Sequence, residues 1–198
     1  MKEIDARGLA CPAPVLLAKD TIEKEHPGIV KVVVDNEASQ QNVTRFLESR
    51  QFEVSAEREG DDFLVFGTMG DTVVYDSPVA PKPEEGQMKI MVMVATDRVG
   101  YGDDGLGLKL MASFIKTLKE MGPELWRLIF VNNGVKLTIE GSEVLPVLKE
   151  YEKEGLQILV CGTCLNHFNL LDQKQVGETT NMLDIVTAMQ LADKVINI

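Results

Sequence analysis

The sequence predicts an α/β protein of two domains joined by a proline-rich linker. Short apolar segments of strand length alternate with segments of helical periodicity in both halves of the 198-residue chain. Between the halves, residues 77–87 (SPVAPKPEEGQ) contain prolines, a glycine and charged residues without any apolar periodicity. We therefore expect a first domain at residues 1–76, a linker at 77–87 and a second domain at 88–198.

The first domain is predicted to be a two-layer β-α-β-α-β-β sandwich, with both helices packed on one face of the sheet. Its strands are β-branched runs or alternate apolar and polar residues, and its helices repeat apolar residues at helical spacing. A Pro27-Gly28 pair ends the first helix. The predicted strands are residues 3–6, 29–35, 52–56 and 63–66, and the predicted helices are residues 12–25 and 38–50.

The second domain is predicted to be a three-layer α/β domain. Its strand candidates are almost continuously apolar, and they alternate with helical patterns. This arrangement is typical of a parallel sheet that is covered on both faces. The predicted strands are residues 89–95, 128–132, 157–161 and 194–198, and the predicted helices are residues 106–121, 142–154 and 181–191.

The charge and hydropathy of the chain exclude several classes of partner. The net charge is −11, from 20 basic and 31 acidic residues, whereas binding to nucleic acid or to an anionic membrane needs clustered Lys and Arg. No segment reaches the roughly 20 apolar residues that span a bilayer. The first residues, MKEIDARG, lack the apolar stretch of a signal peptide. We expect a cytoplasmic protein without nucleic-acid or membrane partners.

The chain has three cysteines, Cys11, Cys161 and Cys164. This number is too small and too sparse for a disulfide-stapled secreted domain, so we expect buried, metal-bound or reactive thiols. A structural zinc site takes four ligands at closed spacing, and only His26 and His167 could join the pair at Cys161 and Cys164. We therefore expect no metal and no cofactor.

Cys11 lies in the sequence GLACPAP, at the predicted start of a helix. Proline is favoured at the first helical position and pushes the residue before it into the extended conformation of an N-cap. This predicts Cys11 at the N-cap, where the positive end of the helix lowers the pKa of a thiol. Ser, Asp or Asn would cap better, which favours a functional thiolate over a tolerated structural cysteine. The other candidate residues of this motif are Gly8, Pro12 and Pro14.

The second candidate site is the CGTC sequence that follows the apolar strand LQILV. Ligands of α/β sheets bind at the carboxyl ends of the strands. A helix that begins near Thr163 or Cys164 would favour a thiolate there, and the CxxC spacing also allows a disulfide. The alternative is that Cys161 is only a small buried apolar residue. The remaining candidates at this edge are Asn132, Asn133, Gly162 and Thr163.

A glycine-rich loop at residues 100–105 (GYGDDG) fits the GxGxxG fingerprint of dinucleotide-binding proteins. Asp103 and Asp104, however, would put negative charge where a pyrophosphate must bind. The next strand also ends without the acidic residue that binds a ribose hydroxyl. We reject a nucleotide site and expect a glycine turn followed by an aspartate N-cap.

These motifs resemble those of a known family. Residues 5–19 (DARGLACPAPVLLAK) resemble the CPxP signature of TusA/SirA-type sulfur carriers, and residues 32–46 (VVVDNEASQQNVTRF) resemble the N-terminal domain of the YedF family, described as sulfurtransferase-like selenium-metabolism proteins. The sequences VNNGVKL, VCGTCL and GETTNMLDIV in the second half resemble the DsrE-type domain of that same family.

The resemblance implies a role for each cysteine. Cys11 would accept a sulfane sulfur as a persulfide and pass it to a partner protein. Cys161 would be the second active thiol, with Cys164 either resolving a persulfide or acting as the nucleophile itself. The implied partners are a cysteine desulfurase or another persulfide donor, an acceptor protein, and further copies of the chain through the DsrE-like domain.

We therefore expect a sulfurtransferase-like persulfide carrier of sulfur or, alternatively, of selenium. Two other functions stay open. The CGTC pair would also serve a thiol–disulfide redox protein or sensor, and the acidic surface would suit a non-catalytic adaptor.

Overall fold

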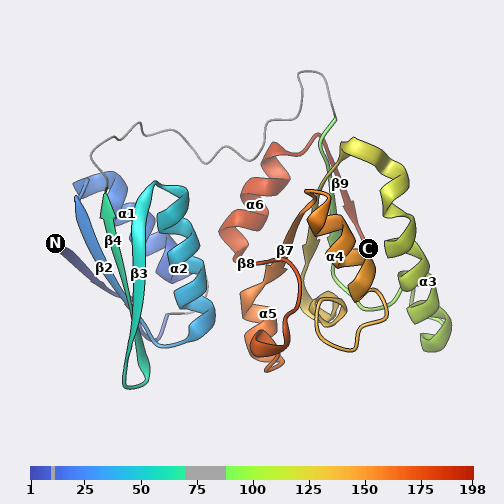
Figure 1. Cartoon of the computed structure of the whole chain (residues 1–198), viewed down its shortest axis with the longest axis horizontal. Helices are drawn as coiled ribbons and strands as arrows, with labels where there is room; N and C mark the ends of the chain where they lie inside the picture. The colour runs from blue at the N-terminus through green and yellow to red at the C-terminus, as the bar shows by residue number, and fades with distance from the viewer. Residues whose placement is uncertain (10–11, 70–87) are drawn as a thin grey trace. The chain divides into compact units, whose positions relative to one another are not determined.

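The structure, a computed structural model, describes residues 1–9, 12–69 and 88–198. The described residues fall into two compact units, one on each side of residues 70–87 (Figure 1). The linker predicted at residues 77–87 lies outside the described residues. Each unit is treated below by itself.

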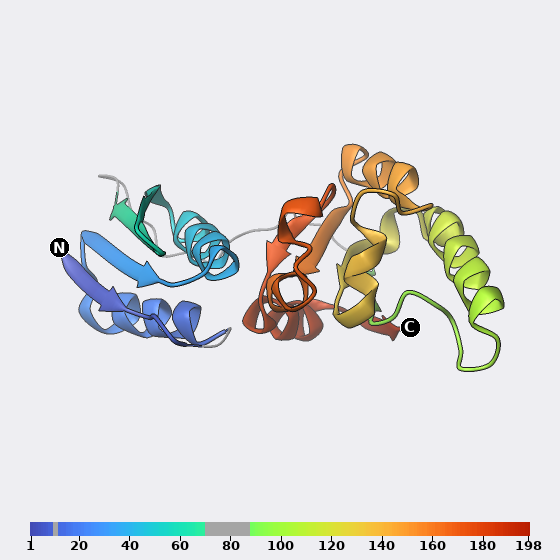
Figure 2. The same ribbon diagram turned by 90° about the horizontal axis from the view of Figure 1, so that it is seen from below.

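The first unit is a four-stranded sheet with two helices, as predicted. The strand order is β1-β2-β4-β3, in which β1 and β2 are parallel and β4 is antiparallel to both of its neighbours. The helices pack against each other, and α2 also packs on β2, β3 and β4 (Figure 2). The elements are β1 (Lys2–Asp5), α1 (Ala13–Glu25), β2 (Ile29–Val34), α2 (Glu37–Ser49), β3 (Phe52–Glu59) and β4 (Asp62–Met69).

The two helices of this unit run side by side in the same direction, because each follows one of the two parallel strands. The turn after β1 is tied to the residue that follows β2 by the backbone N–H of Gly8, which donates to Asp35 Oδ2 at 2.6 Å. The ends of the two helices are tied by the ion pair of Arg50 with Glu23, at 3.5 Å. The helices and strands enclose an apolar core that includes Val15, Ala18, Ile22, Val30, Val32, Val43 and Leu47.

The second unit is a five-stranded, all-parallel sheet of order β8-β7-β6-β5-β9, which confirms the predicted class. One longer α-helix follows β5, another follows β6 after a 3-10 helix, and a third follows β8. The strands are β5 (Ile90–Val94), β6 (Leu125–Phe130), β7 (Gln157–Cys161), β8 (Glu178–Thr180) and β9 (Lys194–Asn197), and the α-helices are α3 (Asp104–Thr117), α4 (Leu145–Lys153), α5 (Gly162–His167) and α6 (Met182–Leu191). The short 3-10 helices are η1 (Leu118–Glu124), η2 (Asn132–Leu137) and η3 (Leu171–Gln173).

Both faces of this sheet are covered, so the unit has three layers. Val92, Phe130 and Val160 belong to a core cluster with residues of α3 and α4. Met91 and Ile129 belong to a second cluster with residues of α6. Figure 1 shows α6 on one side of the sheet and α3 and α4 on the other. The alternation of side chains explains why these strands are apolar at nearly every position.

Three details differ from the sequence prediction. Pro12 has φ −97° and ψ 16° and is itself the N-cap of α1, so the prediction of an N-cap at Cys11 is wrong and the helix begins one residue later than expected. The predicted strand 128–132 instead ends at Phe130, because the chain turns into η2. Strand β8 was not predicted, since its three residues, ETT, show no apolar alternation. None of the helices in the described ranges is long and apolar enough to cross a bilayer.

Candidate functional site

The second-domain cysteines lie where β7 passes into α5. Cys161 is the last residue of β7 and the N-cap of α5, which begins at Gly162. Its side chain belongs to the core cluster that contains residues of α3 and α4, and only 5% of the residue is exposed. Cys164 lies on the first turn of α5 and is half-buried. The thiol that solvent reaches more readily is therefore Cys164.

A segment from another strand end completes the surroundings of Cys164. The backbone N–H of Asn132, the first residue of η2, donates a hydrogen bond to Cys164 Sγ at 3.1 Å. Asn132 has a φ of +48°, in the left-handed region that Asn tolerates better than most residues. The structure thus brings the predicted candidates Asn132 and Cys164 together, through a backbone group rather than the amide side chain.

Gly134 explains why η2 can approach so closely. A Cβ at this position would lie 2.1 Å from the carbonyl oxygen of Val94, at the end of β5. The backbone N–H of Val131 also donates to that oxygen, at 3.0 Å. Only glycine allows this packing, so the Asn-Asn-Gly sequence places the Asn132 N–H at the edge of the sheet.

The surroundings stabilise the thiolate of Cys164. A hydrogen bond from the Cys161 thiol contributes most, and the Asn132 N–H and the electrostatic interaction with His167 add to it. Partial burial opposes these effects. Together they lower the pKa of Cys164 from its ordinary value to about 6, so the thiolate predominates at neutral pH.

The other candidates at this edge have different positions. Gly162 is a buried residue at the start of α5, whereas Thr163 is exposed. Asn133 lines a pocket of about 470 Å³, together with residues of the glycine loop that precedes α3. η2 therefore contributes Asn132 to the thiolate and Asn133 to this pocket.

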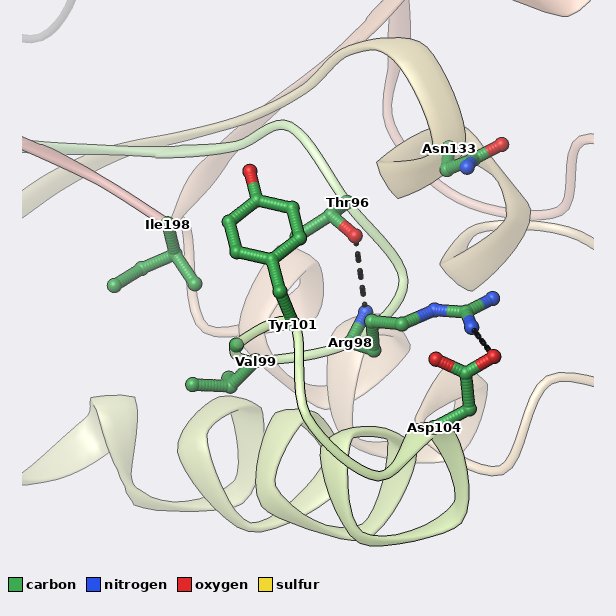
Figure 3. A pocket seen from close by; sticks show the side chains of 8 residues that line it. Thr96, Arg98, Val99, Tyr101, Asp104, Asn133 and Ile198 are labelled. Carbon is green, nitrogen blue, oxygen red and sulfur yellow. Dashed lines mark hydrogen bonds and ion pairs between the residues drawn. The ribbon is translucent and has the colours of Figure 1, made fainter.

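The pocket is bordered by the GYGDDG loop, for which we rejected a nucleotide site. Asp103 is the N-cap of α3 and accepts from the Leu106 N–H at 2.7 Å, which confirms the predicted aspartate cap. Arg98 pairs with Asp104 at 2.6 Å (Figure 3). It also pairs with Asp97 at 2.9 Å. Since two carboxylates neutralise its guanidinium, Arg98 is not set up to bind an anionic ligand.

The GETTNMLDIV sequence supports β7 from its other side. Thr180 pairs with Cys161 across the β7–β8 ladder. Asn181 then caps α6 by accepting from the Asp184 N–H at 3.2 Å. Gly177 has a φ of +81°, which favours glycine. These residues support the strand that carries Cys161.

Cys11 and its neighbour Ala10 lie outside the described residues, which include Gly8 and Leu9 before them and Pro12 after them. Gly8 has a φ of +70° and donates its N–H to Asp35, which lowers the pKa of that carboxyl. Pro12 is the N-cap of α1, and Pro14 is buried on its first turn. The predicted motif residues thus lie where β1 turns into α1.

Across residues 1–9, 12–69 and 88–198, no three His, Cys, Asp or Glu side chains gather in a way that could hold a metal ion.

Comparisons with known families match both units. Residues 2–67 match the family described as Sulfurtransferase TusA, and residues 88–198 match the DsrE/DsrF-like family. The fold and these matches define a sulfur-relay, sulfurtransferase-like class of protein. The chain belongs to the DsrE/DsrF-like family and carries a TusA domain ahead of it, a fusion of the type expected from the YedF resemblance. No curated protein matches the chain.

Three solved structures are similar to parts of the chain. A SirA-like protein from Desulfitobacterium hafniense is 31% identical, with coverage of 36% of this chain and 100% of that one and a TM-score of 0.33. The ychN protein from E. coli is 18% identical, with coverage of 56% and 100% and a TM-score of 0.44. A protein of unknown function from Methanobacterium thermoautotrophicum is 14% identical, with coverage of 57% and 100% and a TM-score of 0.43.

Proposed function

We propose that the protein is a persulfide carrier in which Cys164, together with Cys11, accepts and passes on sulfane sulfur. The observation that carries the proposal is the environment of Cys164. Its half-buried sulfur accepts hydrogen bonds from the Asn132 N–H and the Cys161 thiol. This environment supports Cys164 rather than Cys161 as the nucleophile of the second unit.

The chemistry needs only a thiolate. Cys164 attacks the outer sulfur of a donor persulfide, a new S–S bond forms at Cys164 Sγ, and the donor's own S–S bond breaks to release the donor as a thiolate. A second thiolate then removes the sulfur from Cys164 in the same way. A thiol with a pKa near ambient pH is the best compromise between ionised fraction and nucleophilicity, and the pKa of about 6 for Cys164 lies close to that optimum.

Cys11 is the second proposed acceptor, by its place in the CPAP sequence of the TusA domain. Gly8, whose N–H donates to Asp35, precedes it in the sequence, and Pro12, the N-cap of α1, follows it. We propose that the two thiols carry the same sulfur atom one after the other. The donor of this relay is a cysteine desulfurase or another protein persulfide in the cytoplasm, the acceptor is a further thiol, and the cargo is sulfur or selenium. Self-association through the DsrE-like unit is part of the same proposal.

Persulfide loading of defined variants tests this function. The full-length Cys161→Ser variant is incubated with a cysteine desulfurase and cysteine, alkylated and analysed by peptide mass spectrometry. We expect a mass increase of about 32 Da, one sulfur atom, at Cys11 and at Cys164. The matched control, Cys161→Ser/Cys164→Ser, should lose the adduct in the second unit and keep the one at Cys11.

Loading that is unchanged when Cys11 and Cys164 are both replaced would contradict the proposal. Complete absence of adducts with every donor, including inorganic tetrasulfide, would contradict it as well. An adaptor function would instead leave activity in cells intact when all three cysteines are serine, and that result would also count against a carrier.

A further inference from the structure

We propose that the Cys161–Cys164 pair gives the protein a second activity, the release of carried sulfur as hydrosulfide with formation of a disulfide between the two cysteines. This inference rests on the proposed function, since it starts from a persulfide on Cys164. It assigns Cys161, which the transfer step does not use as a nucleophile, the role of a resolving thiol.

The backbone that carries the two thiols is well anchored. Cys161 is paired with Thr180 in the sheet and caps α5, and Cys164 is one helical turn further along. The Cys161 thiol donates a hydrogen bond to Cys164 Sγ. A CxxC pair at the start of a helix is an arrangement that can close into a disulfide. Little backbone movement is therefore needed for the two sulfurs to bond.

The burial of the pair decides which sulfur Cys161 attacks. Cys161 is 5% exposed and lies in the core cluster, beside residues such as Val160 and Leu165, which are fully buried. Cys164 is half-buried, so a transferred sulfur occupies its open side. A persulfide on Cys164 would then have its inner sulfur, Cys164 Sγ, beside the Cys161 thiol and its outer sulfur toward the open side. A thiolate attacks a sulfur atom in line with the S–S bond that breaks. Attack by Cys161 Sγ on Cys164 Sγ from the buried side therefore favours loss of the outer sulfur.

The step balances without a further oxidant. Cys161 Sγ bonds to Cys164 Sγ, the bond between Cys164 Sγ and the outer sulfur breaks, and the outer sulfur leaves with the bonding electrons. The proton of the Cys161 thiol goes to the departing sulfur, which gives hydrosulfide. The outer sulfur is reduced by two electrons, and the two cysteines are oxidised to a disulfide. A dithiol reductant is then needed before the pair can accept sulfur again.

This activity distinguishes the two units. Cys11 has no cysteine within the sequence that surrounds it, so a persulfide there has no neighbouring thiol from the same segment. A sulfur passed to Cys164 would instead be delivered either to an acceptor protein or, when none is bound, to solution as hydrosulfide. The concentrations of acceptor protein and of dithiol would set the ratio of transferred sulfur to released hydrosulfide.

The test uses the full-length Cys11→Ser chain, so that only the second unit reacts. The reduced protein is mixed without air with a stoichiometric amount of inorganic tetrasulfide. Hydrosulfide is measured colorimetrically, and free thiols are counted by alkylation after denaturation. We expect about one equivalent of additional hydrosulfide per chain, relative to the Cys161 variants, and loss of both free thiols until dithiothreitol is added.

The matched variants are Cys11→Ser/Cys161→Ser and Cys11→Ser/Cys161→Ala, two replacements that guard against a folding defect in either one. Cys164 keeps the Asn132 donor in both variants, so both should still form an adduct of about 32 Da on Cys164 and release no additional hydrosulfide. Loading should be slower in the alanine variant, which lacks the donor at position 161. A stable adduct on the Cys11→Ser chain without a disulfide, or equal release from the Cys161 variants, overturns the discharge activity alone. Failure of both variants to take up sulfur on Cys164 overturns the carrier function together with it.

Discussion

The backbone N–H of Asn132 lies 3.1 Å from the Sγ of Cys164, across 32 residues of sequence. Asn132 begins η2 after β6, and Cys164 belongs to α5 after β7, so the contact joins the ends of two adjacent parallel strands. With the Cys161 thiol as a second donor, it gives one cysteine of the pair the character of a thiolate and leaves the other as its buried partner.

We predict that the pKa of Cys164 depends on the hydrogen bond that the Cys161 thiol donates. Replacing Cys161 by alanine removes the donor that contributes most, so the pKa of Cys164 should rise. Serine keeps an O–H donor at the same place and should raise it less. Below the pKa, each unit of the rise lowers the thiolate fraction about tenfold. The alkylation rate of Cys164 at about pH 6 measures this fraction. Equal rates for the two variants and the parent chain would contradict the assignment.

The packing of Gly134 predicts a coupled loss of stability and reactivity. Gly134→Ala places a Cβ 2.1 Å from the Val94 carbonyl oxygen, so η2 must move away from β5. We expect a loss of about 1–3 kcal/mol in the free energy of unfolding, together with a higher pKa of Cys164, because the Asn132 N–H moves with η2. Trp126, the one tryptophan of the chain, reports unfolding of this unit by fluorescence.

Gly102→Ala is the matched control for this substitution. A Cβ at Gly102 meets no atom within 4 Å, so the change should stay within about 0.5 kcal/mol and leave the reactivity of Cys164 unchanged. If Gly134→Ala behaves like Gly102→Ala, the close approach of η2 to β5 is not what positions the Asn132 N–H.

We predict that replacing Asn42 on α2 by leucine stabilises the protein. Asn42 is 1% exposed, and neither atom of its side-chain amide has a hydrogen-bond partner within the described part of the chain. An unpaired buried polar group costs about 1–3 kcal/mol, so Asn42→Leu should raise the free energy of unfolding by about 1 kcal/mol. Denaturant unfolding followed by circular dichroism measures the change.

Asn36→Ala in the same helix should have the opposite effect. Asn36 caps α2 by accepting from the Ser39 N–H at 2.8 Å, and loss of such a cap costs about 1 kcal/mol. A destabilised Asn42→Leu variant would mean that the amide of Asn42 has a partner when the protein is in solution.

Local patterns predicted much of this fold. The apolar runs of β5 and β7 and the helical periodicity of α4 and α6 appear in the sequence because each element buries its own side chains. Strand β8 is too short to show a pattern, and its position beside β7 depends on tertiary packing. The strand order within each sheet is likewise a property of the packed chain rather than of any one segment.

The candidate site was predictable in composition but not in geometry. The CGTC sequence at a strand end indicated two thiols at the functional edge of the sheet. Which of them is exposed depends on how α5 leaves β7, and the resemblance to a family pointed to Cys161. The donated N–H of Asn132 arises from a backbone turn, which residue identity alone does not reveal. The sequence signal that could have indicated it is Asn-Asn-Gly, a combination suited to a left-handed residue and a close backbone approach.

The most direct test of the account is the iodoacetamide reactivity of the native Cys11→Ser chain as a function of pH, resolved by peptide mass spectrometry. A lowered pKa means that the thiolate is present above the folded value and lost as pH falls through it. We predict alkylation of Cys164 ahead of Cys161, with a rate that falls to half its plateau at a pH of about 6. Faster alkylation of Cys161, or a half-maximal rate for Cys164 near the ordinary thiol value of about 8.5, would contradict it.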